Sequence, residues 1–135
     1  MTVVDTNVLI DIFSDDPTWA RWSTEQVIAA GNAGPVVTTP INYAELSARF
    51  DKRSDLTAWL DRLEVKLEET PPDALFRAGK AFAAYRESGG PRTSLLADFL
   101  IGAHAEVIGH AILTRDTRRF RTYFPAVRLI APDTP

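Results

Sequence analysis

The feature that most constrains the fold is an alternation of short apolar runs with longer segments of helical periodicity. The apolar runs are residues 2–4, 36–38, 65–68, 111–114 and 127–130. Short runs rich in valine and isoleucine are typical of strands that are buried on both faces. Because helical segments separate these runs, the sequence predicts an α/β fold: an open, mostly parallel sheet of about five strands covered by helices on both faces.

Capping and breaking residues divide the helical segments. Asp16-Pro17 and Thr39-Pro40 each place a capping residue before a proline, a pattern that is typical of the first turn of a helix. Gly89-Gly90-Pro91 ends a helix that begins at 71–72, and Ser94 is expected to open the next one. The helices after the second strand and from Ser94 can therefore start at the same edge of the sheet.

Length and composition indicate one soluble globular domain, residues 1–135. The chain has 135 residues, of which 45% are hydrophobic and 24% are charged. No window approaches the length of a membrane-spanning helix, and nothing after Met1 resembles a targeting segment, so we expect a cytoplasmic protein. The absence of cysteine excludes disulfide scaffolds, thiolate metal sites and cysteine nucleophiles.

Carboxylates follow the predicted strands where a ligand site is expected. Ligands of open parallel sheets bind beyond the carboxyl ends of the strands, near the point where the strand order reverses. The candidates at this edge are four acids, Asp5, Glu45, Asp98 and Asp116, with two polar companions, Asn7 and Thr114. We expect the four carboxylates to converge there.

Each acid also has an ordinary structural interpretation. Asp5 could cap the helix that follows it, and Asp116 could form a turn. Glu45 and Asp98 could be solvated helix positions. Asp98 is the hardest to explain in this way, because apolar residues flank it on both sides and a buried charge is costly unless it is paired or bound to a metal.

Converging carboxylates predict a hard cation rather than another mechanism. Acidic groups in a partly buried cleft repel each other unless one is protonated or a cation neutralises them, and all-oxygen ligands suit Mg²⁺ or Mn²⁺. Such an ion activates water for phosphodiester hydrolysis. His104 lies about 240° around its helix from Asp98, and we expect it and His110 to be surface or half-buried residues.

Four segments together resemble the signature blocks of PIN-domain ribonucleases, and more narrowly of VapC toxins. They are Val4-Asp5-Thr6-Asn7-Val8-Leu9-Ile10-Asp11, the mid-chain Glu45, Ala97-Asp98-Phe99-Leu100-Ile101-Gly102-Ala103, and Leu113-Thr114-Arg115-Asp116 followed by Arg119-Phe120. The resemblance covers nearly the whole chain in order. It implies a three-layer PIN fold and an Mg²⁺- or Mn²⁺-dependent endoribonuclease that is the toxin of a toxin-antitoxin pair.

The resemblance also implies roles and partners. Asp5, Glu45, Asp98 and Asp116 would be catalytic, Asp5, Asp98 and Asp116 would bind the metal, and Asn7 and Thr114 would support them. The implied partners are RNA, a second copy of the chain, and a VapB-type antitoxin whose C-terminal segment covers the cleft. Arg119 departs from the pattern, because many relatives have an acidic or polar residue near this position.

The protein carries a net charge of −3, so RNA binding would require a local basic surface. Four arginines surround Asp116, and we expect them to contact RNA: Arg115, Arg118, Arg119 and Arg121. Phe120 and Phe124 would hold their helix against the core. The alternative is a solvated helix face that balances nearby acids.

Other functions agree less well with the sequence. A receiver-like signalling domain needs a late lysine, but the last lysine is Lys80. A haloacid-dehalogenase-type phosphatase needs a second aspartate where Asn7 stands. A catalytically inactive PIN scaffold that binds RNA or protein stays open, although all four acids are present. Large aromatic residues (Trp19, Trp22, Trp59, Tyr43 and several phenylalanines) predict that part of the surface is an apolar patch for a partner; the alternative is that all of them fill the core.

Overall fold

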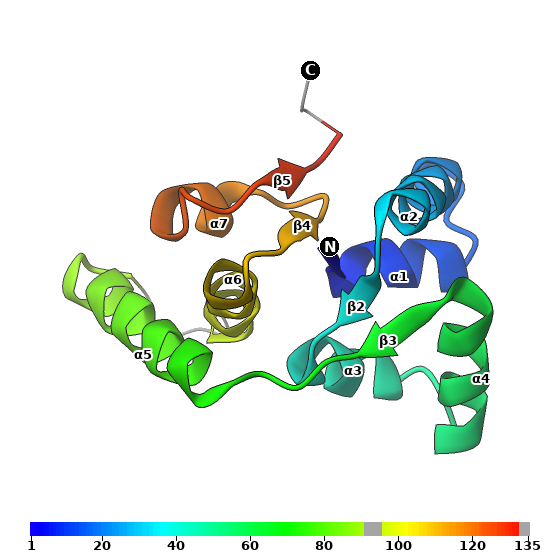
Figure 1. Ribbon diagram of the computed structural model, residues 1–135, viewed down its shortest axis with the longest axis horizontal. Coiled ribbons are helices and arrows are strands. Elements are labelled where there is room, and N and C mark those ends of the chain that lie inside the picture. The colour runs from blue at the N-terminus through cyan, green and yellow to red at the C-terminus, as the bar shows by residue number, and fades with distance from the viewer. Residues whose placement is uncertain (91–95, 133–135) are drawn as a thin grey trace.

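The computed structural model describes residues 1–90 and 96–132, in which strands and helices alternate (Figure 1). The strands are β1 (Thr2–Val4), β2 (Val36–Thr38), β3 (Val65–Leu67), β4 (Ala111–Leu113) and β5 (Leu129–Ile130). The helices are α1 (Thr6–Phe13), α2 (Ala20–Ala33), α3 (Pro40–Ser47), α4 (Arg53–Leu63), α5 (Pro72–Glu87), α6 (Leu96–Ile108) and α7 (Arg118–Tyr123). None of the described helices has the length and apolar character needed to cross a membrane.

The strands form one sheet in the order β3-β2-β1-β4-β5, and each neighbouring pair is parallel. Thr2 of β1 is in register with Val36 on one side and Ala111 on the other. The chain builds the sheet outward from β1 in one direction and then from β4 in the other. The order therefore reverses between β1 and β4, where a ligand site is expected in such sheets.

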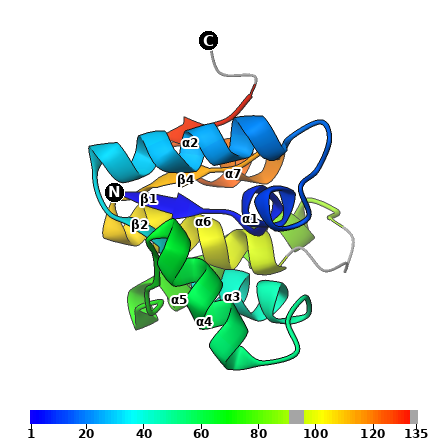
Figure 2. The same ribbon diagram turned by 90° about the vertical axis from the view of Figure 1, so that its right-hand side faces the viewer.

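Successive residues of β1 point into two different cores. Val3 belongs to a cluster with residues of α5, α6 and α7, whereas Val4 belongs to a cluster with residues of α1, α2 and α4. Both residues are fully buried, as expected for a strand with helices on both sides. Figure 2 shows the layers, with α2 on one side of the sheet and α6 on the other. The predicted three-layer α/β fold is confirmed.

The Asp16-Pro17 signal caps a single turn that leads into α2. Asp16 Oδ1 accepts hydrogen bonds from the backbone N–H of Thr18 and of Trp19, and its carbonyl oxygen accepts that of Ala20, as in a helix N-cap. The regular helix α2 begins later than the sequence predicts, at Ala20. The predicted capping residue Ser94 lies outside the described residues.

Of the large aromatic residues, Trp19, Trp22, Trp59 and Tyr43 are half-buried. Two phenylalanines are exposed: Phe76 on α5, at 69%, is the most exposed aromatic side chain among the described residues, and Phe13 on α1 is 39% exposed.

A glycine in α6 sets how closely α7 approaches. A Cβ atom at Gly102 would overlap the ring of Phe124, which is fully buried and directly follows α7. Phe120 on α7 is also buried, so the two phenylalanines hold this short helix against α6, as the sequence predicts. The contact matters for the site because α6 carries Asp98 and α7 carries three of the four predicted arginines, Arg118, Arg119 and Arg121.

Replacing Gly102 by alanine should therefore destabilise the protein. We expect Gly102→Ala to lower the free energy of unfolding by about 1–3 kcal/mol, because the Phe124 ring must move within a packed core. Gly79→Ala in α5 is the matched control: nothing lies within 4 Å of a Cβ there, and we expect a gain of about 0.5–1 kcal/mol from helix propensity. Urea denaturation measures both, and equal effects of the two variants would contradict this interpretation.

Candidate functional site

Asp5 stands at the carboxyl end of β1 and is the best-anchored acid of the site. It is the N-cap of α1, where its Oδ1 accepts the backbone N–H of Thr6 at 2.8 Å. Its Oδ2 accepts the hydroxyl of Thr114, at the end of β4, at 2.7 Å. The side chain is buried, at 7% exposure. Asp5 is thus both the helix cap of the ordinary interpretation and a carboxylate fixed between the two central strands.

A second set of donors comes from α3, and sequence reasoning missed it. Asn42 donates to Asp5 Oδ1 at 3.3 Å and to Thr6 Oγ1 at 2.8 Å. Thr6 in turn donates to Glu45 Oε1 at 2.7 Å. Asn42 is fully buried and forms a capping box with Thr39. The only available signal was its place three residues after the predicted cap Thr39-Pro40, which is typical of a capping box but says nothing about a contact with Asp5.

The loop after β4 positions Asp116. The amide side chain of Asn7 lies 3.4 Å from Asp5 Oδ2 and 3.3 Å from Thr114 Oγ1, and its carbonyl oxygen accepts the backbone N–H of Arg115. Thr114 Oγ1 accepts the backbone N–H of Asp116 at 3.1 Å. The structure thus brings both predicted polar companions next to Asp5, at the reversal of strand order.

Asp98 and Glu45 reach the same edge from helices. Asp98 lies in the first turn of α6 and is partly buried, whereas Glu45 on α3 is exposed. Burial is the main cause that raises the pKa of Asp98 to about 6, and the negative charges of Asp5, Asp116 and Glu45 add to it. The predicted convergence is therefore seen in the charges: the negative charge of each of the other three acids raises the pKa of Asp98.

The pKa values of Asp5 and Asp116 are shifted in opposite directions. Burial raises the pKa of Asp5 despite its hydrogen bonds, and the charge of Glu45 contributes. Partial burial also acts to raise the pKa of Asp116, but hydrogen bonds from Arg118 and the charges of Arg118 and Arg119 outweigh it and hold that pKa below its usual value. The site thus combines two carboxyl groups that resist ionisation with one that favours it.

The carboxylates do not form a closed metal shell as they stand. Among residues 1–90 and 96–132, no three His, Asp or Glu side chains lie close enough together to hold an ion. The chemistry of the donors nevertheless fits a hard divalent cation, because the set is all oxygen and its members raise each other's pKa. Mg²⁺ commonly binds through one or two carboxylates and several waters rather than through a closed shell of protein ligands.

Comparison with known proteins identifies the family. The family model described as PIN domain matches residues 2–125. The chain belongs to the PIN-domain family. By sequence, no curated protein is significantly similar to this PIN domain.

Solved structures with the same fold include toxin-antitoxin proteins. VapBC2 from Rickettsia felis, bound to a DNA fragment from its promoter, matches with a TM-score of 0.74 and 19% identity over 98% of each chain. VapBC-1 from nontypeable Haemophilus influenzae matches with a TM-score of 0.70 and 18% identity over 96% of each chain. FitAcB from Neisseria gonorrhoeae matches with a TM-score of 0.64 and 21% identity over 96% of each chain. At these identities the similarity concerns the fold.

Arg115 of the PIN domain forms an ion pair that sequence reasoning did not foresee. Its Nε and Nη2 donate to the two carboxylate oxygens of Asp11 at 2.7 and 2.9 Å. Asp11 is buried and also accepts the hydroxyl of Ser23 at 2.8 Å, while the guanidinium carbon lies 4.9 Å from the Trp19 ring. The predicted contact of Arg115 with RNA therefore competes with this bidentate pair, which anchors the loop before Asp116 to α1 and α2.

The two histidines lie in a cluster away from the acids, and the prediction that they are surface or half-buried residues is wrong. Both are buried, and Glu68 Oε1 lies 2.8 Å from His104 Nε2 and 2.9 Å from His110 Nε2. His104 Nδ1 is 2.9 Å from the Thr70 hydroxyl. His104 is buried because α6 is covered by α5 on one side and by the sheet on the other, so that a residue facing away from Asp98 is still inside the protein. His110 lies between α6 and β4.

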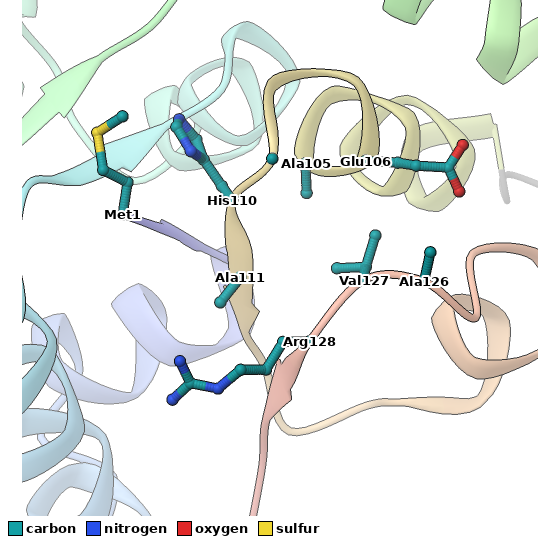
Figure 3. A pocket seen from close by; sticks show the side chains of 9 residues that line it. Met1, Ala105, Glu106, His110, Ala111, Ala126, Val127 and Arg128 are labelled. Carbon is teal, nitrogen blue, oxygen red and sulfur yellow. The ribbon is translucent and has the colours of Figure 1, made fainter.

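A pocket of about 280 Å³ lies at the opposite, amino-terminal edge of the sheet (Figure 3). Met1, His110, Ala111 and Arg128 are among its lining residues, and none of the four predicted acids reaches it. Figure 3 shows the ring of His110 directed away from Val127 and Glu106. This pocket is separate from the candidate site.

Breaking the Asp11–Arg115 pair should destabilise the protein. We expect Asp11→Ala to cost about 3 kcal/mol, because it leaves a partly buried guanidinium without its partner. Arg21→Ala is the control: it removes an exposed pair with Glu25, for which we expect a change below about 0.5 kcal/mol. Chemical denaturation distinguishes them, and a small effect of Asp11→Ala would show that the pair does not anchor the loop.

Proposed function

We propose that this PIN domain is a metal-dependent endoribonuclease and acts as the toxin of a VapBC-type toxin-antitoxin pair. The observation that carries the proposal is the buried Asp5 carboxylate at the reversal of strand order, coupled by charge to Asp98, which is in turn coupled to Asp116 and Glu45. Membership of the PIN family and the fold shared with VapBC proteins support it.

In this proposal Asp5, Asp98 and Asp116 hold Mg²⁺ or Mn²⁺, with Asn7 and Thr114 orienting Asp5. A bound divalent ion would supply a water of lowered pKa and would neutralise charge on the phosphate. Glu45, which accepts a hydrogen bond from the Thr6 hydroxyl, would be the base that takes up a proton from such a water. Asn42 fixes Asp5 and Thr6 together, so that the carboxylates keep their orientation without substrate.

The proposed partners are an antitoxin and a second copy of the chain. VapBC structures with this fold support an antitoxin partner. Large apolar side chains are exposed on several described elements, such as Phe13 at 39%, Ile28 at 58% and Phe76 at 69%. These side chains lie on three different helices, and Phe76 on α5 is the most exposed of them, so we test self-association at that residue.

Removing a single carboxylate should abolish RNA cleavage. We expect Asp5→Asn and Asp98→Asn to reduce the rate by at least ~10²-fold, and EDTA to stop the wild-type reaction, because the charge that binds the metal is lost. The measurement is cleavage of total RNA by purified protein with Mg²⁺. Wild-type activity in EDTA, or full activity of either variant, would refute the metal site, and intact RNA with the wild type would favour the inactive scaffold.

Asp98→Asn also provides its own control for folding. Because the pKa of Asp98 is raised to about 6, its charge destabilises the metal-free folded state above that pH. Allowing for solvent screening, we expect Asp98→Asn to raise the free energy of unfolding at pH 7 by about 1–2 kcal/mol. For the wild type without metal, stability should rise as the pH falls from 7 toward 4, whereas cleavage should weaken as Asp98 takes up a proton.

The assembly can be tested separately. We expect light scattering to give a dimer at micromolar concentration, and a small protein encoded beside this chain to co-purify with it and inhibit cleavage. We expect Phe76→Ser to weaken the self-association, because it removes an exposed ring from α5, and Thr57→Ser at an exposed position of α4 is a control. A monomer with no co-purifying partner would contradict both proposed interactions.

A further inference from the structure

The three arginines that are nearest Asp116 in the sequence differ in what their guanidinium groups contact. Arg115 is committed to the bidentate pair with Asp11. Arg118 is 79% exposed and lies 3.4 Å from Asp116 Oδ1. Arg119 is partly buried, and no carboxylate of the described residues lies within 4.0 Å of it. Only the third of these guanidinium groups thus has no anionic partner in the described part of the protein.

Arg119 is held in place by apolar contacts. Its guanidinium carbon lies 5.4 Å from the centre of the Tyr85 ring, and Tyr85 is itself buried in α5. The neighbouring Phe120 is buried, which fixes the orientation of α7. The Nε atom of Arg119 is buried and has no hydrogen-bond partner among the described residues. Buried polar groups are nearly always bonded, so this donor is an exception, and the guanidinium as a whole has no hydrogen-bonded anion among the described residues.

The position of Arg119 relative to the acids indicates the charge of that ligand. Its positive charge acts on both Asp98 and Asp116 and lowers the pKa of each, so it lies at the acidic edge without pairing with either. A guanidinium with unused donors recognises a planar or tetrahedral oxyanion, often in a bidentate manner. A polyanion that approaches four carboxylates also needs a positive group beside them.

We propose that Arg119 binds a phosphate oxygen of the RNA strand at the acidic site. This inference rests on the proposed ribonuclease function and assigns to one arginine the role that the sequence distributes over four. Tyr85 supports the guanidinium, Phe120 fixes the helix, and the terminal N–H groups of the guanidinium donate to the phosphate. Arg119 is then a catalytic residue, whereas Arg115 is a positioning residue for the loop of Asp116.

The first test measures binding without cleavage. In an Asp5→Asn background, the affinity for single-stranded RNA is measured by fluorescence anisotropy over a range of salt concentrations. We expect Arg119→Gln to flatten the slope of log affinity against log salt by about 0.7, the value for one neutralised phosphate. Arg128→Gln, which removes an exposed arginine at the opposite edge of the sheet, is the charge-matched control and should leave the slope unchanged. Equal slopes for all variants would overturn the proposal.

The second test observes the arginine directly, so a folding defect of the variant does not decide the outcome. Addition of RNA to the ¹⁵N-labelled Asp5→Asn protein should shift the Nε–Hε resonance of Arg119, and that of Arg128 should stay in place. Arg119→Lys should retain the salt slope but cleave RNA ~100-fold more slowly in the otherwise wild-type chain, because a lysine lacks the planar pair of donors. An unshifted Arg119 resonance in a protein that binds RNA refutes this role, whereas a wild type that neither binds nor cleaves RNA refutes the proposed function itself.

Discussion

The site depends on a buried carboxylate at the end of the central strand. Asp5 receives hydrogen bonds from α1, from α3 and from the end of β4, so one side chain joins three parts of the chain that are far apart in sequence. Burial makes its charge costly, and the donors only partly compensate. A carboxylate that is held rigidly and incompletely neutralised is well suited to bind a cation, because it needs no reorganisation when the cation arrives.

The layers of the fold were predictable, because each strand and helix is recognised from the pattern within one short segment of the sequence. Val3 and Val4 point into different cores, and this requires only that a buried strand alternates between two covered faces. The edge that carries the acids was also predictable, because parallel strands share one carboxyl edge. Asp5 and Thr114, which are distant in sequence, are thereby brought into a direct hydrogen bond.

Contacts between side chains of different helices and strands were harder to predict from the sequence. Asn42 is an ordinary capping residue by its spacing, and only the closeness of α3 to α1 makes it a partner of Asp5. Asp11 faces α2 and the loop after β4, and nothing in its neighbourhood in the sequence indicates a partner at position 115. The burial of His104 was predicted wrongly for a related reason. Helical periodicity places it on a different face of α6 from Asp98, but periodicity does not show that both faces of α6 are covered.

The arginines show why charge counting along the sequence is insufficient. Residues within one short segment carry the same charge, yet packing gives them different surroundings: Arg115 is paired with a buried acid, Arg118 is solvated, and Arg119 lies over an aromatic ring. A solvated or paired arginine adds little to the field at the acids, because solvent screens it or its partner cancels it. An unpaired, partly buried guanidinium beside Asp98 acts through a medium of lower polarity and is therefore felt more strongly. A protein with net negative charge can in this way present a local positive group to a phosphate without a basic surface.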